Sequence, residues 1–329
     1  MPKITVTPAG ETFVCPPGDT ILRAALRAGH GMAYSCNVGS CGNCRFDLIE
    51  GSVRHARTDP PAWGERDLKR NRWLGCQAIP QGDCTIKFRA DATFAVDPRP
   101  AQRSAVLEEK SPITRDITQF SLRIAPTAGF HPGQYALLSV PGVDGGRPYS
   151  MSNLPGTDLW QFQIKQTPGG ALTGWLFDTA APGDTLSVDG PYGTAFLDVA
   201  CPRDIVLMAG GSGLSPMVSI ARGAAAAGML EGRKLYIFYG CRTQADLLSD
   251  DLRAELERLG RFTPVLSEPD AGWTGATGFL HNTVQSVMGD RLKDHEIYFA
   301  GPAVMSTAIQ QMAHAQGTPM AQLHFDEFY

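Results

Sequence analysis

Four cysteines constrain the fold of this chain more than any other feature of its sequence. Cys36, Cys41 and Cys44 share one short segment with the spacing C-x4-C-x2-C, and Cys76 follows further along within Leu-Gly-Cys-Gln. A tight loop can deliver the first three thiols to one place, and the fourth must come from a different segment. The front of the chain is therefore expected to be a small domain that brings these two segments together.

This spacing is that of plant-type ferredoxins, in which four thiolates hold the two irons of a [2Fe–2S] cluster. Gly39 and Gly42 lie between the ligands, and glycine takes positive φ without strain, so the loop can bend around the inorganic sulfides. Backbone N–H groups then point at the sulfurs and help to set the potential. Zinc sites favour two closely spaced cysteine pairs, and core thiols would not share a loop with two glycines. The four cysteines are predicted to hold the cluster.

The remaining cysteines, Cys15, Cys84, Cys201 and Cys241, lack such spacing and are predicted to be small buried residues. The N-terminus does not resemble a secretion signal, and no stretch approaches the ~18 apolar residues of a membrane span. We therefore expect a cytoplasmic protein with no membrane partner. The net charge of −4 combines a slight basic excess in residues 1–92 with an acidic remainder, which excludes a nucleic-acid binder built on one strong basic field.

The length of 329 residues predicts two or three domains. Residues 1–92 have the pattern of an α+β, β-grasp-like domain, and the proline-rich residues 93–100 are a predicted linker. Residues 101–200 show short strands separated by turns, which favours an antiparallel β-barrel. Residues 201–329 alternate strands and helices, which favours an α/β domain with a parallel sheet.

The expected elements can be given by residue range. In the front domain these are strands 4–7, 12–15, 45–50 and 85–88 and a helix 21–28. In the middle domain they are strands 117–124, 134–140, 161–166 and 185–188 and a short helix 173–179. In the last domain they are strands 205–209, 235–239 and 296–300 and helices 216–227, 246–258 and 305–316.

Two short motifs in the middle domain carry groups that suit a phosphate-bearing ring compound. Within Arg147-Pro-Tyr-Ser150 the guanidinium can pair with a pyrophosphate, the tyrosine can lie against a flat ring and the serine can bond a ring nitrogen. Gly169–Thr173 can present backbone N–H groups to the same phosphates at a helix start. The alternatives are an ordinary strand end and a simple turn.

Two turns in the last domain follow predicted strands and open helices. Gly210–Met217 lets a phosphate approach a helix N-terminus, although it does not match G-x-G-x-x-G. Gly301-Pro302 would open at the same edge of the sheet, where ligands of α/β domains bind. For Gly301-Pro302 a plain connection between strand and helix is the alternative.

Taken together, the motifs resemble the NADH-dependent reductase components of bacterial multicomponent oxygenases, which belong to the ferredoxin–NADP reductase-like superfamily. The resemblance covers essentially the whole chain and is closest to reductases of naphthalene- and carbazole-type dioxygenases and toluene monooxygenases. It is carried by Tyr34–Cys44, Cys76-Gln77, His131–Tyr135, Arg147–Ser150, Asp189–Gly193, Gly210–Met217, Tyr239–Arg242, Gly301-Pro302 and His324–Tyr329.

The resemblance implies a ferredoxin domain in front, FAD on the barrel and NADH on the last domain; an N-terminal ferredoxin argues for FAD rather than FMN. It assigns to FAD the residues Arg147, Tyr149, Ser150, Ser152, Asn153, Lys165, Gly170, Leu172 and Thr173. It assigns to the nucleotide the residues Gly210, Gly211, Ser212, Gly213, Pro216, Tyr239, Arg242, Asp246, Gly301 and Pro302. A C-terminal aromatic residue, Phe328 or Tyr329, would cover the flavin; equally, the pair can simply close the core.

The implied reaction passes a hydride from NADH to flavin N5, with Tyr149, Ser150 and Tyr329 around the ring, and then single electrons through the cluster. NADH is favoured over NADPH because Asp246 would repel a 2′-phosphate, although Arg242 could attract one. The implied acceptor is an oxygenase, or a Rieske or plant-type ferredoxin. Glu50 and Arg66–Arg72 are candidate contacts for it, with a solvated face as the alternative. Two other functions stay open: a deoxysugar-pathway iron–sulfur flavoreductase, and a redox sensor or electron store without turnover.

Overall fold

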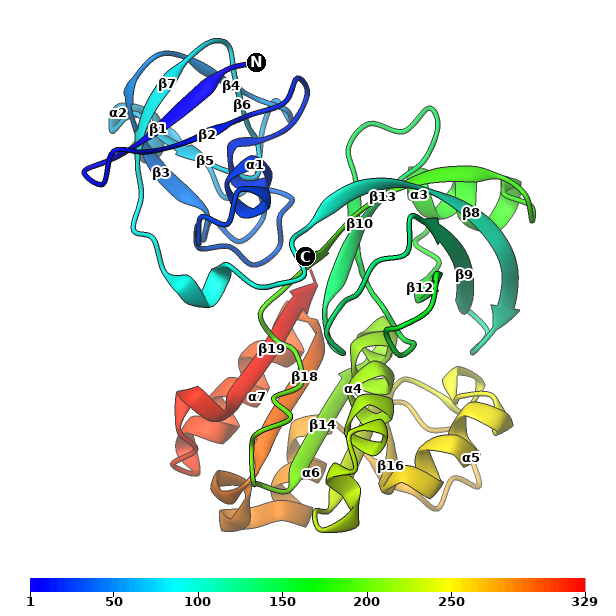
Figure 1. The fold of residues 1–329 in the computed structure, drawn as a ribbon. Coiled ribbons are helices and arrows are strands. Elements are labelled where there is room, and N and C mark those ends of the chain that lie inside the picture. Colours follow the sequence, from blue (N-terminus) through cyan, green and yellow to red (C-terminus); the bar gives the residue numbers. More distant parts are fainter. Residues whose placement is uncertain (329) are drawn as a thin grey trace.

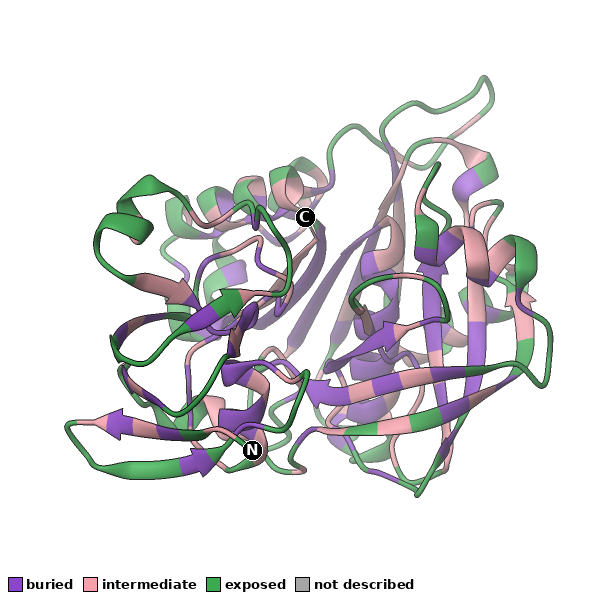
Figure 2. Ribbon diagram, turned by 90° about the horizontal axis from the view of Figure 1, so that it is seen from above, coloured by how far each residue is buried: buried purple, intermediate pink, exposed green. Residues whose placement is uncertain are grey.

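A computed structural model describes residues 1–328. Figure 1 shows three units along the chain: the first, in blue and cyan, lies beside the second, in teal and green, and the third lies below. The units are defined here by their sheets, β1–β7, β8–β13 and β14–β19. Buried residues run through the central strands of each sheet (Figure 2). The multidomain architecture predicted from the sequence is confirmed.

The first unit is a mixed sheet in the order β2-β1-β7-β3-β5, with β4 and β6 forming a separate pair. Helix α1 buries five apolar side chains in the core of this unit, so its amphipathic pattern explains why it forms there. The bounds are β1 (Lys3–Thr7), β2 (Glu11–Val14), α1 (Ile21–Arg27), β3 (Arg45–Glu50), β4 (Val53–His55), α2 (Glu65–Lys69), β5 (Arg72–Leu74), β6 (Ala78–Pro80) and β7 (Cys84–Lys87).

The second unit is an antiparallel sheet in the order β11-β10-β13-β8-β9-β12. A bridge between Met151 and Phe162 joins its two edges, so the sheet closes into a near-barrel around a core that includes Phe120 and Trp160. The bounds are β8 (Ala101–Pro112), β9 (Ile117–Ala125), β10 (Tyr135–Ser139), β11 (Arg147–Ser150), β12 (Leu159–Lys165), α3 (Ala171–Gly174), a π-helical turn η2 (Trp175–Thr179) and β13 (Thr185–Tyr192).

The third unit is a parallel sheet in the order β17-β16-β15-β14-β18-β19, with apolar clusters on both faces. All six residues of β14 are buried, as expected for a central parallel strand. The bounds are β14 (Ile205–Gly210), α4 (Leu214–Ala226), β15 (Leu235–Cys241), α5 (Asp250–Leu259), β16 (Arg261–Leu266), β17 (Ala276–Thr277), α6 (Leu280–Met288), β18 (Glu296–Pro302), α7 (Ala303–Ala315) and β19 (Leu323–Phe328).

Short 3-10 turns connect several of these elements. The predicted linker begins within one of them, and α5 begins four residues later than predicted because a 3-10 turn occupies the residues before it. The turns are η1 (Ala92–Phe94), η3 (Gly211–Gly213), η4 (Met229–Glu231), η5 (Gln244–Asp246), η6 (Gly289–Asp294) and η7 (Met320–Gln322). Within residues 1–328, no helix is long and apolar enough to cross a membrane.

Candidate functional site

The predicted cluster ligands are the best-defined part of the site. The thiol of Cys36 accepts the backbone N–H of Ser40 at 3.4 Å and that of Cys41 at 3.3 Å. The thiol of Cys44 accepts the backbone N–H of Cys76 at 3.4 Å. Backbone donors therefore already point at sulfur, which is the environment that stabilises thiolate ligands.

The four thiols form two pairs. A hydrogen bond from Cys41 lowers the pKa of Cys36 to about 5, and a hydrogen bond from Cys76 lowers the pKa of Cys44. Among the described residues, no three His, Cys, Asp or Glu side chains are placed to hold a single metal ion. Two pairs of thiols, one for each of two irons, are what a [2Fe–2S] cluster requires. The residues present fit that group.

The glycines of the loop are required by its geometry. Gly42 has a φ of +79°, and a Cβ there would collide with the guanidinium of Arg45. That guanidinium donates to the Gly42 carbonyl at 2.8 Å and pairs with Asp67 at 3.0 Å. Gly39, with a φ of +86°, packs against Pro60. The loop is thus held in its conformation by side chains of the neighbouring segment.

Strand β11 carries the Arg-x-Tyr-Ser motif at one edge of the second sheet. Within β11, the strand pairs only with β10, and the next bridge to another strand is at Met151. The other edge of β11 is therefore not paired with a strand along the motif. Arg147 is exposed, and its guanidinium donates weakly, at 3.2–3.4 Å, to carbonyls of its own turn. Tyr149 is half-buried, and burial raises its pKa to about 12. An exposed cation, a neutral ring and free backbone groups fit a flavin nucleotide.

Other residues assigned to FAD have side chains that already serve the fold. The hydroxyl of Ser152 donates to the carbonyl of Gln161 at 3.2 Å, and the side-chain amide of Asn153 donates to the carbonyls of Leu154 and of Leu159, the first residue of β12. Thr173 closes its own turn by donating to two carbonyls, and Leu172 lies in the barrel core. Lys165 pairs with Asp116 at 3.0 Å, and Gly170 precedes α3.

Three side chains of helix α4 donate hydrogen bonds to backbone carbonyls at the end of the flavin motif and just after it. Ser215 donates to the carbonyl of Ser150 at 2.6 Å, Ser219 to that of Asn153 at 2.8 Å, and Arg222 to that of Ser152 at 2.9 Å. These three residues were not predicted from the sequence. Their spacing of four and three residues is a polar stripe on a mostly buried helix, which could have revealed the contact.

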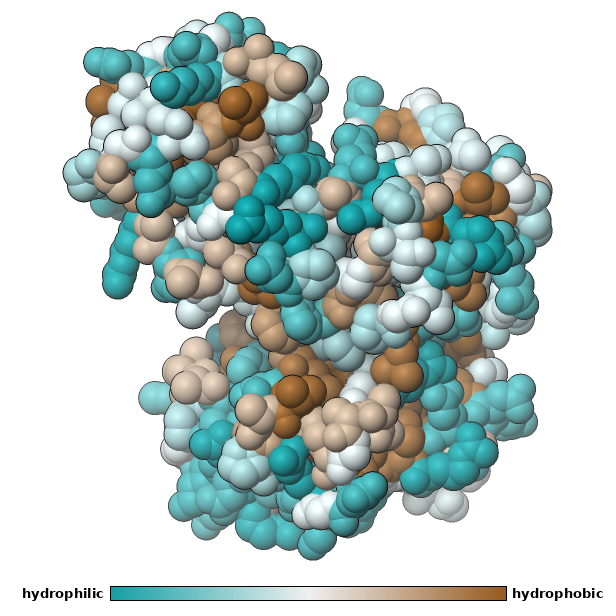
Figure 3. All heavy atoms as spheres, in the orientation of Figure 1, coloured by the Kyte–Doolittle hydropathy of each residue, from teal (hydrophilic) through white to brown (hydrophobic). Residues whose placement is uncertain are grey.

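The two glycine turns of the third unit lie side by side. Gly210–Gly213 begins at the last residue of β14, Gly301-Pro302 ends the adjacent β18, and a Cβ on Gly213 would collide with the carbonyl of Ala300. Strand order reverses between β14 and β18, so the turns flank the crevice where such sheets bind ligands. Apolar residues gather where the second and third units meet on the face in Figure 3. Pro216 is buried in the first turn of α4.

Two of the residues predicted to meet the nucleotide near the end of β15, Tyr239 and Asp246, already make contacts within the protein. Tyr239 is buried and donates to the carbonyl of Asp246 at 3.3 Å. Burial alone would raise the pKa of Asp246, but hydrogen bonds from Thr243 and the charge of Arg115 hold it below its usual range. Arg242 directly follows the strand and is exposed.

The C-terminal strand reaches the point where the three units meet. A cavity of about 270 Å³ lies there, lined by Tyr34 and Asn43 of the cluster loop, Gly193 of the second unit, and His324 and Asp326 of β19. Burial raises the pKa of Asp326 to about 7. Phe328 packs against the third unit's core, and Tyr329 lies outside the described residues.

Comparisons with known proteins agree with this geometry. Residues 4–81 match the 2Fe-2S iron–sulfur cluster binding domain, residues 104–196 the oxidoreductase FAD-binding domain and residues 207–311 the oxidoreductase NAD-binding domain. The ferredoxin–NAD(P)+ reductase CarAd of Metapseudomonas resinovorans is 35% identical, with 96% of each chain covered. The chain belongs to the ferredoxin–NAD(P)+ reductase family of oxygenase systems.

Further members of this reductase family support the same assignment. The ferredoxin–NAD+ reductase component of the alkene monooxygenase system of Xanthobacter autotrophicus is 36% identical over 97% of this chain and 98% of its own. The solved ferredoxin reductase in carbazole 1,9a-dioxygenase superposes with a TM-score of 0.93 at 32% identity, covering 100% of this chain and 98% of its own. This reductase is an oxidoreductase, and its expected cofactors, a [2Fe–2S] cluster, FAD and a nicotinamide nucleotide, are confirmed.

Proposed function

We propose that this reductase oxidises NADH and delivers the electrons singly to an oxygenase or to an intermediary ferredoxin. One NADH would reduce two equivalents of a one-electron acceptor and release NAD+ and one proton. When bound, FAD accepts the hydride and the cluster relays single electrons. The observation that carries the proposal is spatial: the cluster loop, the β11 edge and the paired glycine turns belong to three units that meet at one cavity.

The chain's own residues hold and orient these groups. Arg147 would hold the pyrophosphate of FAD, Tyr149 would pack on the ring, and Ser150 would bond N5. Gly210–Gly213 would receive the pyrophosphate of NADH. Helix α4 begins at that turn and is bonded to the carbonyl of Ser150, so the nicotinamide and flavin sites have a fixed relative position.

We propose NADH rather than NADPH as the donor. Asp246, next to the end of β15, is held ionised by Thr243 and Arg115. A carboxylate there would disfavour a 2′-phosphate on the adenine ribose. Arg242 is the one opposing group of the predicted set, and it is exposed, so the proposed preference rests on Asp246.

An anaerobic absorbance titration of the purified protein with NADH, repeated with NADPH, tests these assignments together. We expect stoichiometric NADH to bleach both the flavin and the iron–sulfur bands, and NADPH to act only at much higher concentration. Bleaching of the flavin alone would contradict the electron path through the cluster. Rapid steady reduction of ferricyanide by NADH would in addition exclude a sensor without turnover.

We further propose that the acceptor docks on the face formed by residues 54–73 together with Asp47, which lies opposite Arg72 on strand β3. This surface is called here the acceptor face. Its apolar centre is the stacked pair Trp63 and Trp73, with ring centroids 5.3 Å apart, together with Leu68, which is 58% exposed. Both indole N–H groups are bonded within the protein, so the rings offer apolar surface. Aromatic residues and arginines are the groups most enriched at the centre of protein interfaces.

The acceptor face lies directly against the cluster loop. The N–H of Ala62 donates to the carbonyl of Gly39 at 3.1 Å, and Arg45 connects the Gly42 carbonyl to Asp67 of α2. Of the four ligands, Cys41 is the half-buried one. The other side of the loop lines the cavity between the units, so electrons would enter on one side and leave on the other.

The charges of the acceptor face predict an acidic partner. Its acidic side chains are paired with cations, with Asp47 and Asp67 in close contact with arginines and Asp59 and Glu65 in looser pairs at 3.7 Å. Within the described part of the chain, the guanidinium groups of Arg54, Arg66 and Arg70 make no ion pair. These free cations would steer and orient an acidic acceptor.

Reversing two of these charges should slow electron delivery to an acidic acceptor. With an acidic plant-type ferredoxin as acceptor, Arg66→Glu/Arg70→Glu should lower kcat/KM by roughly tenfold at low ionic strength, with less effect at high salt. Reduction of ferricyanide should not change. Arg258→Glu, on exposed helix α5, is the matched control. An unchanged rate with the acidic ferredoxin, or an equal loss with the basic acceptor cytochrome c, would contradict this docking face.

A further inference from the structure

Three buried tyrosines form the contact between the first and second units. Tyr34 accepts the backbone N–H of Gly193 at 2.8 Å, and Tyr135 donates to the carbonyl of Ser35 at 2.5 Å. Tyr192 donates to Asp189 at 2.9 Å. Burial raises the pKa of all three phenols, so they stay neutral hydrogen-bonding groups. We call these three residues the tyrosine junction.

Tyr135 occupies a special place in this junction. In the register of β10 and β11 it lies opposite Ser150, the residue expected to bond flavin N5. Its hydroxyl bonds the carbonyl of Ser35, the residue directly before the cluster ligand Cys36. One side chain therefore links the strand pair of the flavin site to the loop of the iron–sulfur site. Tyr34, two residues before Cys36, supplies the reciprocal bond from the first unit to the second.

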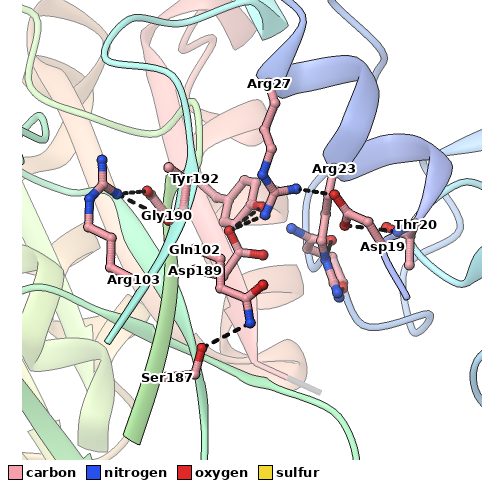
Figure 4. Close-up of polar contacts among 12 residues, drawn as sticks. Asp19, Thr20, Arg23, Arg27, Gln102, Arg103, Ser187, Asp189, Gly190 and Tyr192 are labelled. Atoms are coloured by element: carbon pink, nitrogen blue, oxygen red, sulfur yellow. Dashed lines mark hydrogen bonds and ion pairs between the residues drawn. The ribbon is translucent and has the colours of Figure 1, made fainter. Parts of the chain in front are cut away.

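An ion-pair network adjoins the junction at Tyr192, as Figure 4 shows. Arg27 of α1 contacts Asp19 at 2.7 Å within the first unit and Asp189 of β13 at 2.6 Å in the second. Asp189 also accepts the hydroxyl of Tyr192, so the carboxylate is shared between both units. The side chains of this network are only 13–21% exposed, so salt screens their charges less than those of open surface pairs.

We propose that Tyr135 and Tyr34 are positioning residues that set the geometry of flavin-to-cluster electron transfer within a fixed pair of units. The inference rests on the proposed function, because it concerns the step between the two redox groups. Neither tyrosine reacts: no bond is formed or broken at its hydroxyl, and the electron passes between the redox groups alone. The hydroxyls keep the distance between the flavin site and the cluster site constant. A ferredoxin unit that moved independently of the barrel would not keep this distance constant.

Tyr135→Phe tests this role by removing one oxygen and preserving the ring. In anaerobic stopped-flow mixing with NADH, the flavin band should bleach at a rate within about twofold of wild type. The cluster band should follow several-fold more slowly, because the rate of electron transfer falls steeply as the separation of the two redox groups grows. Tyr34→Phe should act in the same direction. The EPR spectrum of the dithionite-reduced cluster should be unchanged in both, since no ligand is altered.

Tyr298→Phe is the matched control, because Tyr298 is also buried and also accepts a backbone N–H, that of Asp198 at 3.0 Å, but in the third unit. It should leave cluster reduction at the wild-type rate. Wild-type cluster reduction in both junction variants, with full flavin and iron content, would overturn the positioning role. Failure of NADH to bleach the flavin of the wild-type protein would instead refute the proposed function, so the two failures are distinguishable.

Discussion

Replacing Cys41 by serine should leave the reduction of flavin by NADH intact and abolish electron delivery to a one-electron protein acceptor. Flavin and nucleotide lie in the second and third units, and the thiol belongs to the first, so the hydride step does not need it. A serine hydroxyl is a poor substitute for a thiolate on iron because it stays protonated at neutral pH. The rates are measured by the bleaching of the flavin band and by the reduction of an acidic ferredoxin.

The control for this variant is Cys84→Ser. Cys84 is another buried cysteine of the first unit, and its thiol donates to the carbonyls of Ser52 and Gly82, a role that a hydroxyl can take over. It should retain iron, sulfide and electron delivery. Unimpaired delivery by Cys41→Ser would refute the role of the cluster as the exit for electrons.

Arg147→Ala should yield protein that is largely free of FAD. The guanidinium is the exposed cation at the start of the free edge of β11, and its bonds to its own turn are long and solvent-exposed. The fold therefore loses little when it is removed. The cofactor loses a charge-assisted contact of about 1.5–3 kcal/mol, which corresponds to an affinity lower by roughly tenfold to a hundredfold. Flavin content after purification and fluorescence titration of the apoprotein with FAD measure the effect.

Arg123→Ala is the control for Arg147→Ala. Arg123 is an arginine of the same barrel that pairs with Glu108 and Asp158 on the outer surface of β9, away from the motif. It should keep its full flavin content. We expect Arg147→Lys to recover part of the affinity for FAD, because lysine restores the charge but cannot form bidentate hydrogen bonds. Full occupancy in Arg147→Ala would remove this residue from the site.

The features that could be predicted from the sequence are those in which spacing dictates geometry. Three cysteines and two glycines within one loop leave few arrangements, and the structure pairs the thiols of Cys36 and Cys41 with each other and that of Cys44 with Cys76. The glycine turns at the ends of β14 and β18 could be placed because parallel strands end at the same edge of a sheet. The alternation of short strands likewise predicted the near-barrel.

What could not be predicted is which polar groups the fold uses for itself. Ser152, Asn153 and Tyr239 have residue types suited to a cofactor, yet their side chains bond nearby carbonyls. Strands β4, β5 and β6 have three residues each, too few to show a period. Strand β8 has a mixed pattern because only its middle is buried.

The apolar side of the tyrosine junction has a consequence for how this molecule can be divided. Tyr135, Leu137 and Tyr192 belong to the chain segment of the barrel but are counted among the buried residues of the ferredoxin core. Separating the two units would expose these large side chains to water and leave a cavity in the ferredoxin core. The ferredoxin portion is therefore not an interchangeable cassette: a chimaera that exchanges it must carry matching residues at these three barrel positions to fold as one cooperative body.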